Sequence, residues 1–286
     1  LVCLVGSEMC IRDREKIHRI RRPEPELADL EDAKAALMKA EKPLIISGGG
    51  VHYSLATDEL KAFAEKHNIP VVETIAGRAT MLQDNPLNAG PIGVTGSDSA
   101  NYMAAHADVV LAIGTRLQDF TTGSWSVFRN PDMKLIAMNV ARFDAIKHRA
   151  LAVKCDAQRG MAKLSQLLGD WRSSDDWAST AKAQADEWKA VVQRRTNPQE
   201  GDLLPGMSSY AEVIGKLNKS MQPGDTVLTA AGGLPAELAM NWQNYQIGKF
   251  DIEFGFSCMG YEIAGGWGAK VANPDNDVVG LVGDGS

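Results

Sequence analysis

The sequence predicts an α/β fold in which one doubly wound parallel sheet is followed by the start of a second α/β domain. Short apolar runs alternate with helix-like segments between residues 43 and about 168, as in parallel sheets crossed by helices. The runs lack polar-apolar alternation, so we expect both faces of the sheet to be covered. A polar segment, residues 169–205, separates this unit from a second alternation of strands and helices.

The elements of the first unit follow from apolar periodicity. Residues 26–42 place apolar side chains at helical spacing, which predicts an amphipathic helix that Pro43 closes. A second helix is expected from about Leu55 to His67. Strands are expected in the apolar runs PLIIS (43–47), IPVVET (69–74), DVVLAIGT (108–115), KLIAMNV (134–140) and ALAVKC (150–155).

The separating segment and the second unit are assigned in the same way. The segment is expected to hold one helix at about 175–195, whose tryptophans pack on a neighbouring element. After residue 205, helices are expected at 210–220, 233–243 and 260–272, and strands in TVLTAAGG (226–233) and DVVGLVGDGS (277–286). We therefore predict a central domain over 15–168, a linker with a helix over 169–205, and a second domain over 206–286.

Composition limits the classes of function. The 286 residues carry a net charge of -6, which argues against nucleic-acid and membrane-surface partners because both favour a basic face. No apolar stretch approaches the ~20 residues of a membrane span. The four cysteines form neither a disulfide framework nor a zinc pattern, so we expect a cytoplasmic protein with Cys155 and Cys258 buried.

The first fourteen residues, LVCLVGSEMCIRDR, resemble a translated sequencing-adapter scar rather than a signal peptide. We exclude them from the fold prediction. With the abrupt end at Ser286, they suggest a fragment truncated on both sides.

The chain ends on Gly283-Asp284-Gly285-Ser286, directly after an apolar run. Ligands of open α/β sheets bind beyond the carboxyl ends of strands, where glycine amides can face a phosphate and a carboxylate can bind Mg²⁺. Taken alone, the motif is more often a polar turn with an aspartate cap.

The preceding segment, EFGFSCMGYEIAGGWGAK (253–270), changes that balance. Together with the strand and GDGS, it resembles the diphosphate-binding domain of thiamine-diphosphate enzymes of the acetolactate synthase and pyruvate decarboxylase superfamily. The resemblance implies that Asp284 binds Mg²⁺, that Met259 bends the cofactor, and that the Ser257 carbonyl accepts a hydrogen bond from the aminopyrimidine. The residues assigned to the cofactor are Gly232, Gly233, Leu234, Ser257, Met259, Gly260, Gly283, Gly285 and Ser286.

The first unit is similar to the Rossmann-like central domain of the same superfamily, which binds FAD without a catalytic role or binds nothing. Gly48-Gly49-Gly50 lacks the third glycine of a dinucleotide fingerprint, because Tyr53 stands there. We interpret it as a tight turn. Arg116 and Asp119 are expected to be structural.

Within the superfamily, the segments IGVTGSDSANYMAAHADVVLAIGTRLQDFTTGSWSVFRNP, NVARFDAIKH and FGFSCMGYEIAGGWGAK most resemble the ring-opening trihydroxycyclohexanedione hydrolases of myo-inositol breakdown. This implies opening of a cyclic 1,2-dione to 5-deoxy-glucuronate, with the cofactor between the subunits of a homodimer or homotetramer. The alternatives are an acetolactate synthase-like carboligase and a non-catalytic nucleotide-binding module.

Two parts of the family pattern are missing from the chain. The activating glutamate belongs to an N-terminal pyrimidine-binding domain, and the Asn-Asn pair of the Mg²⁺ motif follows the GDG. We expect the chain alone to be inactive and to bind thiamine diphosphate weakly or not at all. The five histidines form no metal-binding spacing and are expected to be structural, with His52 and His148 closest to strand ends.

Overall fold

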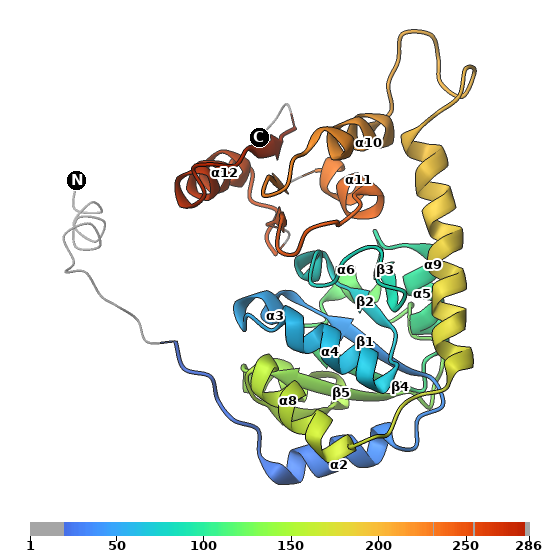
Figure 1. Ribbon diagram of the computed structural model, residues 1–286, viewed down its shortest axis with the longest axis vertical. Coiled ribbons are helices and arrows are strands. Elements are labelled where there is room, and N and C mark those ends of the chain that lie inside the picture. Colours follow the sequence, from blue (N-terminus) through green and yellow to red (C-terminus); the bar gives the residue numbers. More distant parts are fainter. Residues whose placement is uncertain (1–19, 231, 254, 284–286) are drawn as a thin grey trace, which may run out of the picture.

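The computed structural model describes residues 20–230, 232–253 and 255–283. They form two parallel sheets, and the long helix α9 runs beside both parts of the molecule (Figure 1). Among these residues, no helix is long and apolar enough to cross a membrane.

The first sheet has six parallel strands in the order β3-β2-β1-β4-β5-β6. This is the doubly wound Rossmann order, in which the direction of progression reverses between β1 and β4. The central strands β1 and β4 pair over their whole lengths, from Pro43 opposite Val109 to Ser47 opposite Ile113. The strands are β1 (Pro43–Ser47), β2 (Val71–Glu73), β3 (Asn88–Pro91), β4 (Val109–Ile113), β5 (Lys134–Asn139) and β6 (Leu151–Lys154).

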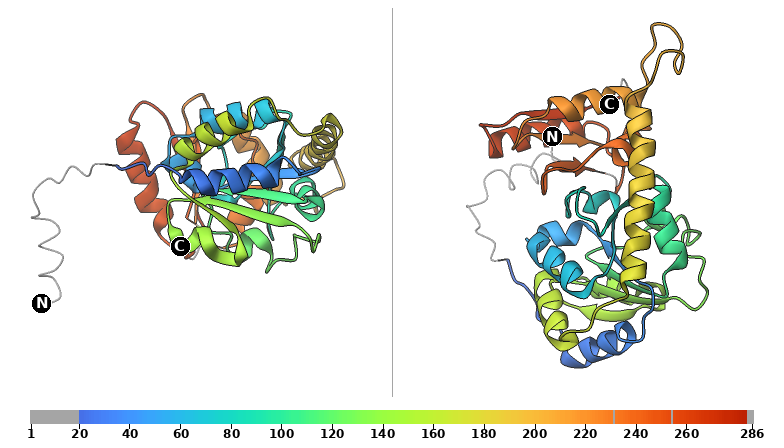
Figure 2. Two further views of the ribbon diagram at one scale, coloured as in Figure 1. Left: turned by 90° about the horizontal axis from the view of Figure 1, so that it is seen from below. Right: turned by 45° about the vertical axis from the view of Figure 1, so that its right-hand side comes forward.

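Both faces of this sheet are covered, as expected from apolar strands without alternation. On one face, Ile45 and Leu111 belong to a core that includes residues of α2, α4 and α8. On the other face, Leu44 and Val110 meet residues of α5 and α9. Figure 2 shows the helices on the two sides of the sheet. The helical segments of this part are α2 (Leu27–Leu37), α3 (Gly49–Tyr53), α4 (Thr57–His67), η1 (Ile75–Gly77), α5 (Asp98–His106), α6 (Asp119–Thr122), α7 (Arg142–Ile146), η2 (Lys147–Arg149) and α8 (Ala157–Leu168).

Helix α9 (Asp175–Thr196) has the signals of a stable helix at both ends. The Ser174 side chain accepts a hydrogen bond from the Trp177 amide, acidic residues occupy the first turn, and arginines occupy the last. Trp177 is buried, and its indole N–H donates to the Pro43 carbonyl at 2.9 Å. The helix packs against α5 and β3 and also against α10 and α11, so it contacts both parts of the molecule.

The second sheet has three parallel strands in the order β8-β7-β9. Helices α10 and α11 supply Ile214, Leu238 and Ala239 to the core on one face. On the other face, α12 packs on β7 and β9. The elements are α10 (Tyr210–Ser220), β7 (Thr226–Thr229), α11 (Leu234–Asn241), β8 (Phe250–Ile252), α12 (Tyr261–Ala272) and β9 (Val278–Leu281).

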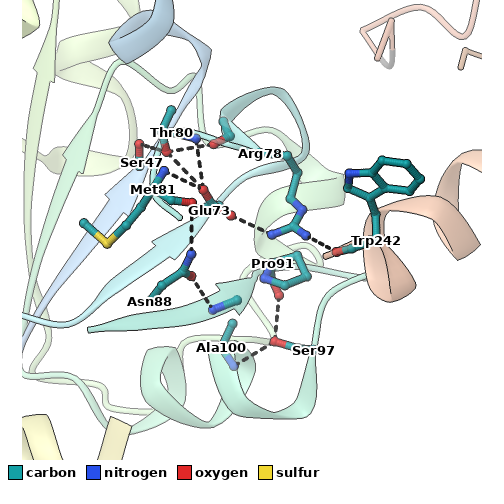
Figure 3. A network of polar contacts seen from close by, with 12 residues as sticks. Ser47, Glu73, Arg78, Thr80, Met81, Asn88, Pro91, Ser97, Ala100 and Trp242 are labelled. Atoms are coloured by element: carbon teal, nitrogen blue, oxygen red, sulfur yellow. Dashed lines mark hydrogen bonds and ion pairs between the residues drawn. The ribbon is translucent and has the colours of Figure 1, made fainter. Parts of the chain in front are cut away.

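Arg78, in a buried ion pair of the central part, also bonds the second part (Figure 3). Glu73, the last residue of β2, bonds Arg78 at 2.6 Å, and both side chains are at most 1% exposed. The other end of the guanidinium donates to the carbonyl of Trp242, at the end of α11, at 2.8 Å. The second Glu73 oxygen accepts the amides of Thr80 and Met81, so the carboxylate is fully engaged. Ile75 and Ala79 extend the contact by packing in the core of the second sheet.

The structure contains several elements that were not individually predicted, among them helices α5 and α8 of the central part. Strands β3 and β8 were not predicted, because NAGP and FDI contain no apolar run. The first helix ends at Leu37 rather than at residue 42. Helix α3 begins at Gly49, inside the predicted glycine turn, and precedes the predicted helix.

Candidate cofactor site

The candidate site lies at the carboxyl edge of the second sheet. Strand β7 leads through Gly232 and Gly233 to α11, β8 leads through Ser257 and Met259 to α12, and β9 leads to Gly283. Because β7 is paired in parallel with both neighbours, the three loops leave the same edge. The described residues that sequence reasoning assigned to the cofactor lie in these loops or at the helix starts that follow. Asp284, Gly285 and Ser286 lie outside the described residues.

The glycines of these loops leave the backbone accessible to a ligand. Gly232 and Gly260 have φ values of +93° and +89°, a conformation that other residues adopt only with strain. A Cβ added at Gly232, Gly233 or Gly260 would meet no atom of the described residues within 4 Å. Internal packing does not explain these glycines, and a ligand can approach their backbone closely. The arrangement therefore fits a diphosphate.

Two helices begin at this edge with glycine N-caps. Gly233 caps α11 and Gly260 caps α12, and neither offers a side chain to the first turn. At α12 the buried Glu262 carboxylate in the first turn already binds the Gly260 amide. The positive end of the α11 dipole faces the edge and favours an anionic ligand there.

Ser257 and Met259 are both exposed in the loop before α12. The Met259 side chain is 69% exposed, so it does not pack in the core. Ser257 has φ = +50°, a left-handed conformation that is costly for a residue with a Cβ. Both residues are thus presented to solvent at the predicted site.

The chain matches the family model of the thiamine pyrophosphate enzyme central domain over residues 30–164. It also matches the family model of the C-terminal TPP binding domain of thiamine pyrophosphate enzymes over residues 230–286. The chain belongs to the thiamine pyrophosphate enzyme family.

Similar curated proteins share one description. The chain is 38% identical over 291 residues to the 3D-(3,5/4)-trihydroxycyclohexane-1,2-dione hydrolase of Geobacillus thermodenitrificans, covering 95% of this chain and 45% of that protein. It is 36% identical over 293 residues to the Clostridium tetani protein of the same name, covering 96% and 46%. It is 38% identical over 296 residues to that of Clostridium perfringens, again covering 96% and 46%. The chain thus spans about half the length of these relatives.

In this member of the thiamine pyrophosphate enzyme family, two carboxylates that sequence reasoning missed bind the loop between β8 and α12. Glu253 accepts the amides of Phe256 and Cys258 at 3.0 and 2.7 Å. Glu262, only 2% exposed, accepts the Gly260 amide at 3.1 Å. The amide bonds, above all that from Cys258, hold the pKa of Glu253 below its ordinary value. An acidic residue directly after a strand and before a glycine-containing loop was the available sequence signal.

The expectation for Cys258 was wrong, because its side chain is exposed next to Ser257. Its thiol pKa is raised, first by partial loss of hydration and then by the Glu253 charge. Cys155 is buried as expected, and burial raises the pKa of its thiol to about 12.

The glycine triplet of the central domain serves close packing. A Cβ on Gly48 would lie 2.4 Å from the carbonyl oxygen of Gly114, and one on Gly50 would lie 2.6 Å from the Gly114 Cα. The amides of Gly48 and Gly50 donate to the carbonyls of Ile113 and Gly114. The prediction of a tight turn was wrong, because Gly48 is the N-cap of α3 and Gly49 and Gly50 are its first residues. The missing side chains of Gly48 and Gly50 let this helix start touch the loop after β4.

A cavity of about 590 Å³ lies between the two parts of the chain. Residues after β1, β4 and β5, such as Gly49, Arg116 and Val140, line one side of it. Residues after β8, such as Glu253 and Phe256, line the other side. The carboxyl ends of strands from both sheets therefore border one space.

The two histidines closest to strand ends have structural contacts, and His18 lies outside the described residues. His52 Nε2 lies 2.9 Å from the Arg78 carbonyl, and the His148 ring packs edge-on against Trp125. Within the described part of the chain, no three His, Cys, Asp or Glu side chains are placed to hold a metal ion. Arg116 is exposed and donates to Gln118.

Proposed function

We propose that the chain forms the central and cofactor-binding part of a thiamine-diphosphate- and Mg²⁺-dependent hydrolase. Its substrate would be trihydroxycyclohexane-1,2-dione, opened to 5-deoxy-glucuronate in myo-inositol breakdown. The main structural support is the convergence of three glycine-containing loops, at the ends of β8, β7 and β9, on one edge. The names of the similar hydrolases support the choice of substrate.

In this proposal, different loops of the chain bind different parts of the cofactor. Gly232, Gly233 and Leu234 hold the diphosphate from one loop, and Gly283, Gly285 and Ser286 hold it from another. Asp284 provides a carboxylate for Mg²⁺, which prefers oxygen ligands and binds together with phosphates. The N-terminus of α11 adds favourable potential for the anion.

The organic part of the cofactor meets the third loop. The exposed Met259 side chain supports the bent shape of the cofactor through an adaptable apolar contact. The Ser257 carbonyl accepts a hydrogen bond from the amino group of the aminopyrimidine. When bound, thiamine diphosphate supplies a carbon nucleophile and an electron sink for breaking a carbon-carbon bond.

The test uses the protein expressed from its natural reading frame, so that any sequence flanking these residues is included. With thiamine diphosphate, Mg²⁺ and the cyclic dione, we expect acid release in a pH-stat. Asp284→Asn should lower this rate at least about tenfold by weakening the Mg²⁺ site. The matched control is Asp275→Asn, an exposed carboxylate of the same domain, which should keep the wild-type rate.

The alternative carboligase is tested in parallel with pyruvate as the substrate. Acetolactate formation without ring opening would overturn the proposed hydrolase activity, and the assignment to the family would stand. Absence of thiamine diphosphate binding to the wild-type protein would overturn the cofactor assignment itself.

We further propose a homodimer or homotetramer for the natural protein. Ile263, Trp267 and Val271 recur along one side of α12, and each is at least 66% exposed. Such an exposed apolar stripe is typical of an interface. Sedimentation should show the oligomer, and Trp267→Lys should shift it toward monomer.

A further inference from the structure

The loop between β8 and α12 is bound by carboxylates at alternate amides. Glu253, which directly follows β8, accepts from Phe256 through Oε1 and from Cys258 through Oε2. Glu262 accepts from Gly260. The amides of residues 256, 258 and 260 are therefore all bound to the acids that flank the loop.

These bonds determine where the Ser257 carbonyl points. The peptide between Ser257 and Cys258 is trans, and in a trans peptide the N–H and C=O bonds point in opposite directions. Since the Cys258 N–H points at Glu253, the Ser257 carbonyl points away from it. Among the described residues, no backbone or side-chain group donates a hydrogen bond to this carbonyl. It is thus directed outward and available as an acceptor.

The conformation needs external support. Ser257 has φ = +50°, and holding a residue with a Cβ in such a region costs free energy. Bonds from two amides to one carboxylate can offset this cost, because charge-assisted hydrogen bonds are about twice as strong as neutral ones. A charge bound to the N–H also polarises the peptide, which makes its carbonyl a better acceptor.

We propose that Glu253 is a positioning residue that directs and polarises the Ser257 carbonyl toward the amino group of the cofactor's aminopyrimidine. The inference rests on the proposed function, because only a bound thiamine diphosphate provides that amino group. Glu253 itself is not assigned any contact with the cofactor.

The test compares two ligands on the natural protein by calorimetry. One is thiamine diphosphate, and the other is oxythiamine diphosphate, in which an oxo group replaces the amino group. In Glu253→Gln, the negative charge is lost and an NH₂ group, which cannot accept, replaces one of the two acceptor oxygens, so the charge-assisted bonds to the Phe256 and Cys258 amides cannot both be kept. We expect the affinity for thiamine diphosphate to fall about tenfold and that for the oxo analogue less than about twofold.

The matched control is Glu200→Gln, the same chemical change at an exposed residue of the loop after α9, which should alter neither affinity. Equal losses for both ligands in Glu253→Gln would overturn the proposal, because Glu253 would then only support the loop. No loss for either ligand would also overturn it. If the wild-type protein binds no thiamine diphosphate, the proposed function fails and this inference falls with it.

A second measurement is independent of the cofactor. Hydrogen exchange of the unliganded protein should be faster at the amides of Phe256 and Cys258 in Glu253→Gln than in wild type or Glu200→Gln. Unchanged exchange would show that the carboxylate does not hold these amides and would overturn the proposal even if ligand affinities changed.

Discussion

Glycine serves two opposite purposes in this chain, according to what surrounds its Cα. Gly48 and Gly50 are pressed against Gly114, where a Cβ would collide with backbone atoms. Gly232 and Gly260 face open space in the left-handed conformation. The first kind holds the central domain together, and the second leaves room for a ligand. Only the local geometry distinguishes the packing glycines from the ligand-facing ones, because the residue type is the same.

A variant of Met259 should change cofactor binding without changing the stability of the fold. Because its side chain is 69% exposed, Met259→Ala should change the free energy of unfolding by less than about 0.5 kcal/mol. The same change should weaken thiamine diphosphate binding at least about fivefold, since an apolar contact is lost. Thermal melts and calorimetry of the natural protein check both expectations.

Met207→Ala is the control, because Met207 is 65% exposed in the loop before α10. It should change neither quantity. A large loss of stability in Met259→Ala, with unchanged binding, would mean that Met259 serves packing after all.

At the scale of elements, a buried histidine ties α4 to α8 and to the start of the linker. His67 Nδ1 donates to the Trp171 carbonyl at 2.6 Å, and Nε2 lies 2.9 Å from the Ser165 hydroxyl. Burial lowers the pKa of His67, so the ring is neutral in the folded protein at neutral pH.

This contact predicts the pH dependence of stability. The unfolded chain takes up the proton at the ordinary histidine pKa of about 6.5, whereas the folded chain does so only at lower pH. The free energy of unfolding should therefore fall as the pH decreases below about 6.5, with a contribution of at most about 1.4 kcal/mol per pH unit. Urea unfolding of wild type and His67→Gln between pH 5 and 7 measures the difference in slope.

His106→Gln is the matched control, because His106 is exposed at the end of α5. Its slope should equal that of wild type. A wild-type slope in His67→Gln would contradict the assignment of this pH dependence to His67.

Sequence reasoning found most elements that have a strong periodic or apolar signal, but it did not name the amphipathic helix α8, whose Met161, Leu164 and Leu168 are buried. Helix α9 and the central strands β1 and β4 were predicted within a few residues, because length, caps and apolar content agree there. Strands β3 and β8 were missed, because their pairing is imposed by neighbouring strands rather than by their own composition. The α2 boundary was missed because helix ends depend on tertiary contacts.

At the scale of the whole molecule, Arg78 links the two sheets through one buried charge. Arg78→Met should lower the free energy of unfolding by about 3–5 kcal/mol, because Glu73 is left buried and unpaired. Arg116→Met, at an exposed arginine of the same domain, should stay within about 0.5 kcal/mol of wild type. Denaturant unfolding measures both.

The double variant Glu73→Gln/Arg78→Met separates charge from packing. It should recover part of the loss, since no uncompensated charge remains in the core. If it were no more stable than Arg78→Met, the cost would come from lost contacts with Trp242 and its neighbours rather than from Glu73.

The sequence also indicated which loops form the candidate site, because the joint pattern of the 253–270 segment and GDGS is specific. It did not indicate that Glu253 and Glu262 bind the third loop, since two acids nine positions apart look like ordinary surface charges. Cys258 was misplaced for a related reason: small apolar side chains are usually buried, and only the fold shows this loop turned outward.

The position of Cys258 allows cofactor binding to be followed by chemical labelling of its thiol. Its thiol is exposed between two residues assigned to the cofactor, whereas Cys155 is buried with a thiol pKa of about 12. A maleimide applied at mildly alkaline pH should therefore modify Cys258 rather than Cys155, and saturating thiamine diphosphate should slow the reaction at least about fivefold. The difference in labelling between wild type and Cys258→Ser isolates this signal. A decrease in Cys258 labelling would therefore report cofactor binding without any catalytic turnover.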